Sequence, residues 1–287
     1  MSRTAHKLMA SGAKSEDVVK QSLMFNAADT AYLKRTPSSA GNRRTFTLST
    51  WIKLTSSSFA NGAIFGCGIS TTDAEVIYLS IYQGRLSFQT YNTTWRRTTS
   101  LLRDVGAWYH IVFAIDTTQG TAQNRIRIYI NGEEETSFST NSNPSQNYDF
   151  IMNTTNEHQL GDEGGQTGGI NPWDGYMSEF HFIDGTQLTP SSFGKTDPIS
   201  GQWVPKKVGG LTYGTNGYYL PFTKNDRYSV YFDDTSSTGI TIADSTDWDF
   251  GTNNFTVECW FYRNEDAGDQ SYLFGQSDYS HGANSGN

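Results

Sequence analysis

Short runs of β-type residues, each bounded by turn residues, follow one another along most of this chain. They recur at a spacing of about ten residues, and no long amphipathic helical pattern separates them. Many short strands of this kind pack best as two antiparallel sheets, so the sequence predicts an all-β sandwich. The expected strands are residues 22–25, 46–54, 62–69, 76–82, 85–91, 108–116, 125–132 and 176–184.

The segment RIRIYING, residues 125–132, carries the clearest local signal. Isoleucine occupies every second position from Ile126 to Ile130, which indicates a strand with one buried face. Asn131 and Gly132 follow, and this pair favours the two positive φ angles of a type I′ turn. We therefore predict a β-hairpin at this turn, with the acidic run 133–135 on its solvated edge.

Composition and charge narrow the functional class. Aromatic residues make up 14% of the 287 residues and charged residues only 17%, a balance that suits sheets better than helices. The net charge of −8 argues against a nucleic-acid or anionic-membrane binder, because phosphate binding needs a basic face. No apolar stretch is long enough to span a membrane, and the first residues lack a secretion signal. We expect a soluble protein made in a reducing cytoplasm, with Cys67 and Cys259 as free thiols.

One strand pattern occurs twice, as RTFTLSTWIKL at residues 44–54 and as NFTVECWFYRN at residues 254–264. The spacing from Phe46 to Trp51 equals that from Phe255 to Trp260, and the spacing from Trp51 to Phe65 equals that from Trp260 to Phe274. A sandwich closes only when strands from both ends of the module pair. We therefore expect the natural chain to continue past Asn287 or, as the alternative, a neighbouring subunit to complement the second copy. The predicted organisation is an N-terminal arm at 1–20, a sandwich at 21–225 and an incomplete second repeat at 226–287.

Several of these motifs occur in an order that resembles the concanavalin A-like, laminin-G-type jelly-roll module. The residues that carry the resemblance are Phe46, Trp51, Trp108, His110, the segment 129–132, Trp173, Gly175, Glu179 and Leu188. The resemblance implies a jelly-roll sandwich over residues 22–223, and the start of another from residue 228.

A second resemblance concerns biological role. The opening AHKLMASGAK, the segment from Ser22 to Lys53 and the tandem second module look like structural proteins of tailed bacteriophages, particularly those of marine bacteria. This similarity implies a tail-fibre or head-decoration protein, made in the host cytoplasm and located in the virion. Its expected partners are other virion proteins and further copies of itself. Residues of the arm that we expect to attach the protein are Leu8, Met9, Val18 and Val19.

Enzymatic signatures are absent from the sequence. Retaining β-glucanases of this fold place carboxylates as E-x-D-x-x-E on one strand, and no such string occurs here. The histidines lack metal-ligand spacing, and no G-x-S-x-G nucleophile elbow is present. His110 is interpreted as a half-buried strand residue. We expect a protein that acts through assembly and is not an enzyme; a host-glycan lectin and, less favoured, a polysaccharide depolymerase are the alternatives.

The loop LGDEGGQTGGINPWDG, residues 160–175, contains acidic side chains that suit a calcium ion. Its candidate ligands are Asp162, Glu163 and Asp174, joined by Asp116 from a neighbouring strand end. The alternative is a glycine-rich turn whose acids face water. No cofactor is required by the sequence.

Aromatic residues in loops are candidates for sugar binding, because flat rings stack on the C–H faces of sugars while polar groups bind the hydroxyls. The candidates are Tyr91, Trp95, Arg96 and Trp173. Packing or a subunit contact is the alternative role for both tryptophans. Trp51 is interpreted as a core residue.

Overall fold

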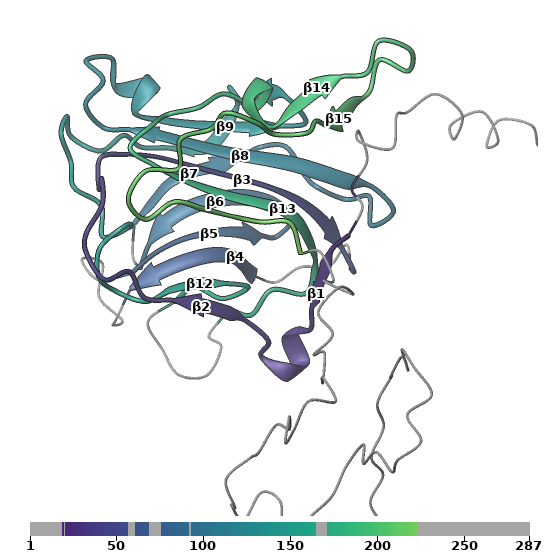
Figure 1. Cartoon of the computed structure of the whole chain (residues 1–287), viewed down its shortest axis with the longest axis horizontal. Helices are drawn as coiled ribbons and strands as arrows, with labels where there is room; N and C mark the ends of the chain where they lie inside the picture. Colours follow the sequence, from purple (N-terminus) through teal and green to yellow (C-terminus); the bar gives the residue numbers. More distant parts are fainter. Residues whose placement is uncertain are drawn as a thin grey trace, which may run out of the picture. The chain divides into compact units, whose positions relative to one another are not determined.

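The computed structural model describes residue 19 and residues 21–56, 61–68, 76–91, 93–164 and 171–222. Two antiparallel sheets of seven strands each face one another, with a small two-stranded sheet outside them (Figure 1). The all-β sandwich predicted from the strand pattern is therefore confirmed. Helical structure in the described residues consists of short 3-10 turns, at η1 (Ala27–Asp29), η2 (Ala122–Arg125) and η3 (Pro190–Ser192).

We call the first sheet sheet A. Its strand order is β1-β13-β3-β8-β9-β10, and β16 also pairs with β13. The strands are β1 (Leu23–Phe25), β3 (Thr45–Leu54), β8 (Trp108–Asp116), β9 (Ile126–Ile130), β10 (Glu133–Glu134), β13 (Gly175–Asp184) and β16 (Tyr218–Leu220). The long strand β3 lies between β8 and β13, so segments far apart in the sequence meet in the middle of this sheet.

We call the second sheet sheet B, and its strand order is β11-β7-β6-β5-β4-β12-β2. Its strands are β2 (Leu33–Arg35), β4 (Asn61–Gly68), β5 (Val76–Tyr82), β6 (Arg85–Thr90), β7 (Thr94–Thr98), β11 (Phe138–Asn141) and β12 (His158–Leu160). The small third sheet pairs β14 (Gly194–Thr196) with β15 (Trp203–Pro205).

The core fills the space between sheets A and B, and phenylalanine dominates it. Buried rings from the two sheets pack tilted against one another, as Phe65 does with Phe180 and Phe88 with Phe113. Alternation explains this arrangement, because every second residue of β3 and β8 points inward. Burial of one large apolar side chain contributes about 1.5–3 kcal/mol, so this single cluster supplies most of the driving force for the fold.

The hairpin predicted at Asn131 and Gly132 is confirmed. Their φ angles are +50° and +88°, and β9 pairs with β10 directly across the turn. The prediction of a single buried face is incomplete, because the opposite face of β9 is partly buried as well. Tyr129, on the face opposite the core, is only 6% exposed.

The outer face of sheet A is covered by the segment that follows β13. A second apolar cluster forms there, with Val112, Tyr129 and Ile183 from the sheet packed against Phe193. Partly buried side chains of residues 188–213 complete this cluster. The covering segment includes the small sheet, which lies outside β8 and β9 in Figure 1. Sheet A is therefore a middle layer, sandwiched between the core and this segment.

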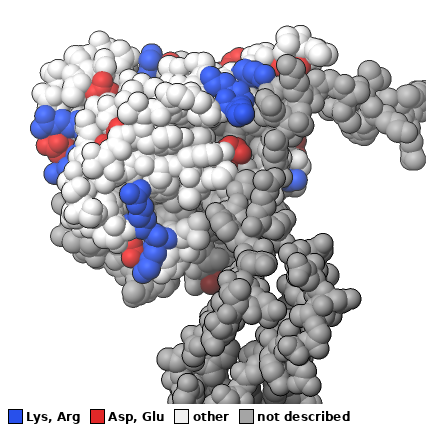
Figure 2. All heavy atoms as spheres, viewed as in Figure 1, with Lys and Arg blue, Asp and Glu red and all other residues white. Residues whose placement is uncertain are grey.

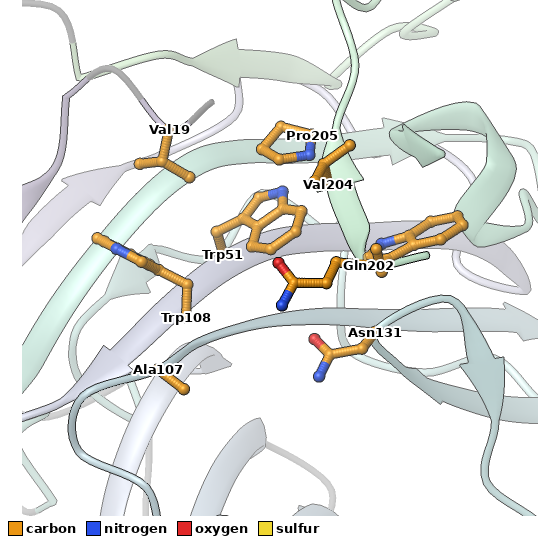
Figure 3. Close-up of a pocket in the computed structure, with 9 residues that line it drawn as sticks. Val19, Trp51, Ala107, Trp108, Asn131, Gln202, Val204 and Pro205 are labelled. Atoms are coloured by element: carbon orange, nitrogen blue, oxygen red, sulfur yellow. The ribbon is translucent and has the colours of Figure 1, made fainter. Parts of the chain in front are cut away.

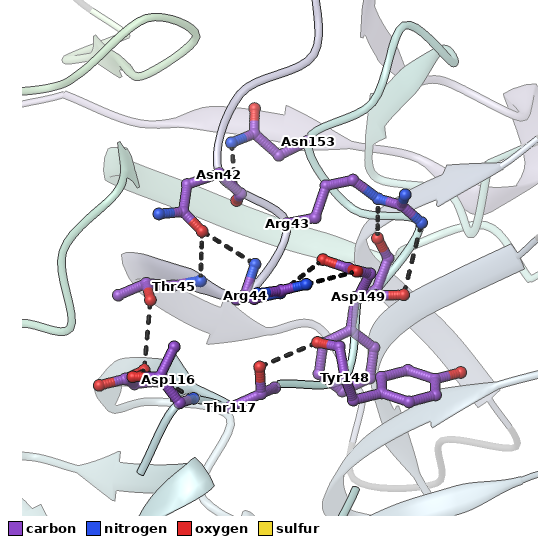
Figure 4. A network of polar contacts seen from close by, with 11 residues as sticks. Asn42, Arg43, Arg44, Thr45, Asp116, Thr117, Tyr148, Asp149 and Asn153 are labelled. Carbon is purple, nitrogen blue, oxygen red and sulfur yellow. Dashed lines mark hydrogen bonds and ion pairs between the residues drawn. The ribbon is translucent and has the colours of Figure 1, made fainter. Parts of the chain in front are cut away.

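Polar contacts fasten the chain at the start of β3 (Figure 4). Arg44 forms a two-pronged ion pair with Asp149, with Nε–Oδ1 and Nη2–Oδ2 distances of 2.9 and 3.0 Å. Arg43 donates to the Phe150 carbonyl at 2.6 Å. The Asn42 side chain accepts from two backbone N–H groups and thereby caps this turn. These contacts hold the segment before β12 against the start of β3.

Several expectations fall on residues that the structure does not describe. The proposed second repeat at 226–287, with Cys259, lies outside the described residues, as do Leu8, Met9 and Val18. Cys67 is a buried free thiol, and burial raises its pKa to about 12, which keeps it protonated. Among the described residues, no helix has the length and apolar character needed to span a membrane.

Candidate functional site

A pocket of about 590 Å³ lies on the outer face of sheet A, next to the covering segment. Three tryptophans from three strands surround it: Trp51 of β3, Trp108 of β8 and Trp203 of β15. Figure 3 shows Trp51 near its centre and Trp108 to one side. The remaining described residues that line it are Val19, Ala107, Asn131, Gln202, Val204 and Pro205.

Strand register places two of these tryptophans together. Trp51 is paired with His110, and the next residue pair on the same face joins Lys53 to Trp108. Side chains two positions apart on a strand share a face, so both indoles rise from the outer face of sheet A. Trp51 is buried, as predicted, but it lies outside the core cluster between the sheets and stacks on His110 at 4.9 Å. It forms the floor of the pocket, while Trp108 and Trp203 are half-buried walls.

Trp203 is held in place from several sides. Its Nε1 donates to Nδ1 of His110 at 2.9 Å, and its ring stacks on the imidazole. Two glycines leave space for the indole: a Cβ at Gly132 would lie 2.5 Å from Trp203 Cε3, and one at Gly194 would lie 2.7 Å from Cε2. These contacts fix the position of the Trp203 ring in the wall of the pocket.

His110 is a structural residue of this site. It is 1% exposed, and not half-buried as predicted, because Trp51 and Trp203 enclose its ring. An indole N–H is only a donor, so Nδ1 of His110 accepts and its Nε2–H donates to Ser49 Oγ, 2.8 Å away. This is the opposite of the proton direction that a serine nucleophile needs. Burial, followed by the nearby His181, lowers the pKa of His110 to about 3.

Two amide side chains give the pocket polar groups. The Asn131 Oδ1 accepts the backbone N–H of His110 at 2.8 Å, which fixes the orientation of this amide. Its Nδ2 has no hydrogen-bond partner among the described residues. Gln202 is exposed at the same pocket, and Figure 3 shows both amides there. None of the described lining residues is charged.

The glycan residues predicted from the sequence lie elsewhere. Tyr91 lies directly after β6, in the connection to β7, and is 46% exposed. Trp95 of β7 is half-buried and packs against Tyr148 and Phe150, with ring centroids 5.6 and 5.9 Å apart. Neither residue lines the pocket. The packing alternative therefore accounts for most of the Trp95 ring, while Tyr91 remains open to solvent.

The prediction of a sugar-binding role is wrong for Arg96 and Trp173, because both are fully buried. The Arg96 guanidinium donates to Gln123 Oε1 at 3.2 Å, to Asn143 Oδ1 and to the Ser142 carbonyl. It therefore anchors a loop. Trp173 belongs to the core cluster and contacts the backbone at the end of sheet A, so neither of its faces can receive a ligand.

The four predicted calcium ligands accept hydrogen bonds from different partners in the protein. Asp116 accepts from Thr45 Oγ1 and from the turn at residues 118–119. Asp162 accepts the Glu163 backbone N–H at 2.7 Å, and Glu163 accepts from an amide. Asp174 accepts from Thr55 Oγ1 at 2.5 Å. Within the described ranges, no group of three or more His, Cys, Asp and Glu side chains is placed to hold a metal ion.

The predicted attachment residue Val19 lies at the pocket. Close by, Ser178 Oγ of β13 donates to the Gln21 carbonyl. The end of the N-terminal arm therefore lies along the outer face of sheet A. Sequence reasoning missed Trp108 and Trp203 as site residues. The signal for Trp108 was present, because Trp108 and His110 alternate with the core residues Ile111 and Phe113 and so mark an apolar second face.

Comparison with known proteins agrees with the fold described above. A family model described as the concanavalin A-like lectin/glucanases superfamily matches residues 27–192. A heptameric SAP-like pentraxin from Limulus polyphemus is 17% identical, with a TM-score of 0.48, covering 72% of this chain and 93% of its own. Domains LG4-5 of the mouse laminin α1 chain are 13% identical, with a TM-score of 0.41; the match covers 73% of this chain and 49% of the laminin chain. Domain 4 of the arabinanase AbnA from Geobacillus stearothermophilus is 21% identical, with a TM-score of 0.37; the match covers 52% of this chain and 65% of the arabinanase domain. No curated protein matches the chain.

Proposed function

Since this chain belongs to the concanavalin A-like lectin/glucanases superfamily, we propose that it is a carbohydrate-binding protein without enzymatic activity. The pocket over Trp51 is the binding site. The observation that carries this proposal is the lining of that pocket, where three indoles from separate strands surround two amide side chains.

This lining matches the chemistry of a sugar. An indole face stacks on the C–H groups of a pyranose ring, and the half-buried rings of Trp108 and Trp203 are the faces available for stacking. Amide groups donate to and accept from hydroxyls, which is what Asn131 and Gln202 offer. Rigid placement lowers the entropy lost on binding, and the contacts of Trp203 with His110, Gly132 and Gly194 provide it.

The absence of charge in the described lining favours a neutral sugar. A carboxylated or sulfated glycan would leave its charge without a partner there, and the net charge of −8 would repel it at a distance. The same absence supports binding without hydrolysis, because glycoside cleavage uses a pair of carboxyl groups. His110 cannot replace them, since both ring nitrogens are engaged.

A glycan array tests the proposal. The full chain should bind a set of neutral glycans, and Trp108→Ala should lose that binding, because it removes one wall while leaving the core intact. Tyr91→Ala is the matched control, since Tyr91 is an exposed aromatic away from the pocket. Loss of binding in Tyr91→Ala with full binding in Trp108→Ala would move the site to the connection between β6 and β7 and refute the pocket.

An assay for new reducing ends separates this proposal from a depolymerase. The bound polysaccharide should release no product during prolonged incubation with the protein. Release of oligosaccharides would show hydrolysis and would overturn the non-enzymatic assignment.

A second proposal concerns where such a protein works. We propose a fibre or decoration protein of a tailed phage, with residues 1–20 as the tether to other virion proteins. Its support is the resemblance of the N-terminal region to such proteins, together with the position of Val19 and Gln21 on the outer face of sheet A. Mass spectrometry of purified virions tests it: hundreds of copies indicate head decoration, a few trimers indicate a fibre, and no copies refute it.

A further inference from the structure

A row of outward-facing residues leads away from the pocket across sheet A. Met24 of β1 is paired with Tyr176 of β13, Tyr176 with Lys53 of β3, and Lys53 with Trp108 of β8. Their neighbours on these strands, such as Ile52, face the core. All four side chains of the row therefore lie on the outer face of sheet A.

The row lies beyond the part of this face that the covering segment buries. The apolar cluster under that segment uses Val112, Ala114 and Ile183, at the other end of the strands. In contrast, Met24 is 51% exposed, and Tyr176, Lys53 and Trp108 are each half-buried. Trp108 belongs both to the row and to the pocket, so the two surfaces are continuous.

The dimensions of the row set the size of its ligand. Neighbouring strands lie about 4.8 Å apart, so a row across four strands is about 14 Å long. Trp203 and the amides of the pocket lie beyond its Trp108 end. This length is that of a short oligosaccharide and exceeds that of a single sugar ring.

We propose that the pocket and this row form one groove that binds a neutral oligosaccharide chain of several sugars. This inference rests on the proposed carbohydrate-binding function. Trp108 and Trp203 hold one end of the chain, Tyr176 stacks on a sugar further along, and the Lys53 ammonium donates to hydroxyls between them. Met24 borders the far end of the groove with an apolar side chain.

Calorimetric titration with oligosaccharides of increasing length tests the groove. The probes are the cello-, laminari- and malto-oligosaccharide series, each from the disaccharide to the hexasaccharide. In the series that binds, affinity should rise with length until the groove is filled. Tyr176→Ala should weaken binding of the hexasaccharide about tenfold, the value of one aromatic contact, and leave the disaccharide unchanged. Trp108→Ala should weaken binding of both, and Tyr91→Ala of neither.

The outcomes separate this inference from the proposed function. Equal affinity of Tyr176→Ala and the unchanged protein for the hexasaccharide would refute the groove and leave the pocket standing. If none of the three series nor any glycan on the array binds, both proposals fail. A dimer in sedimentation that Tyr176→Ala dissociates would assign the row to contact between copies of this chain and overturn the groove. Thermal melting of each variant verifies that the fold is retained.

Discussion

Gly132 shows how one residue can meet two independent requirements. The type I′ turn needs a positive φ, which Gly132 adopts at +88°. The indole of Trp203 lies so close that no Cβ fits there. Only the first requirement is visible in the sequence, because the second comes from a strand some seventy residues further along the chain.

Substitution of glycines by valine separates these two requirements. Gly185→Val tests the backbone alone, because Gly185 has a φ of +90° and an added Cβ would contact nothing; strain there should cost about 1–3 kcal/mol. Gly132→Val should cost clearly more, since it also displaces Trp203. Gly120→Val is the control with neither feature. Urea unfolding gives the free energy of unfolding of each variant, and the loss should be largest for Gly132→Val and smallest for Gly120→Val. Equal stability of these two variants would contradict the described turn.

Among the elements, the small sheet β14–β15 and the end of the N-terminal arm complete the outer face of sheet A. β15 supplies Trp203 and Pro205 to the pocket, and the arm supplies Val19. Neither element contributes to the main core cluster. Their contribution is therefore to the site more than to the stability of the sandwich.

Removal of residues 1–20 tests this division of roles. The truncated protein should fold with an almost unchanged melting temperature, because β1 begins at Leu23 and the core starts at Phe25. The loss of Val19 should open the pocket and shift the tryptophan fluorescence to longer wavelength. The truncated protein should also fail to enter virions if the arm is the tether. An unfolded product would contradict the first expectation, and normal incorporation the last.

For the molecule as a whole, charge plays a small part in stability, and burial plays a large one. Lys and Arg form small separate groups on a mostly uncharged surface in the face shown in Figure 2. The ion pairs, such as Lys34–Glu157, have solvent-exposed partners and contribute little. Buried histidines are a stronger electrostatic feature, because His110, His158 and His181 are each at most 3% exposed.

These histidines predict the pH dependence of stability. Burial lowers the pKa of His110 and His181 to about 3 and that of His158 to about 4, against an ordinary value of 6.5. Above pH 6.5 the three histidines are neutral in both the folded and the unfolded state, so they do not change the free energy of unfolding. Below it, the unfolded chain binds protons that the folded chain excludes, so the free energy of unfolding falls as the pH falls. Each histidine contributes a slope of about 1.4 kcal/mol per pH unit.

Denaturant unfolding between pH 7.5 and pH 5 measures this effect. Aspartates with a lowered pKa, such as Asp116, titrate below this window, so they do not contribute to the change in stability within it. Burial raises the pKa of Glu163, and protonation of this side chain in the folded state opposes the trend. Replacement of His158 by glutamine should reduce the slope by about one third of its value. A flat profile across the window would show that the histidines are accessible to protons in the folded state.

Most of the sandwich could be predicted from local patterns in the sequence. Each of the eight strands expected from β-type runs has a counterpart within a few residues, because alternation and turn residues are local properties. β7 and β11 of sheet B were not predicted. β2, β12 and β14–β16 were missed as well, since three-residue strands carry too little pattern. Their positions depend on pairing with partners far away in the chain.

The candidate site required the tertiary structure. Alternation in β3 and β8 reveals two faces, but it does not say which face will be covered, or by what. The sequence therefore suggested Trp173 as an exposed ring, while packing buries it completely. Trp203 reaches the pocket only because the chain turns back after β13 and lays β15 beside Gly132. Contacts between distant segments depend on how all the layers pack together, and no local pattern encodes them.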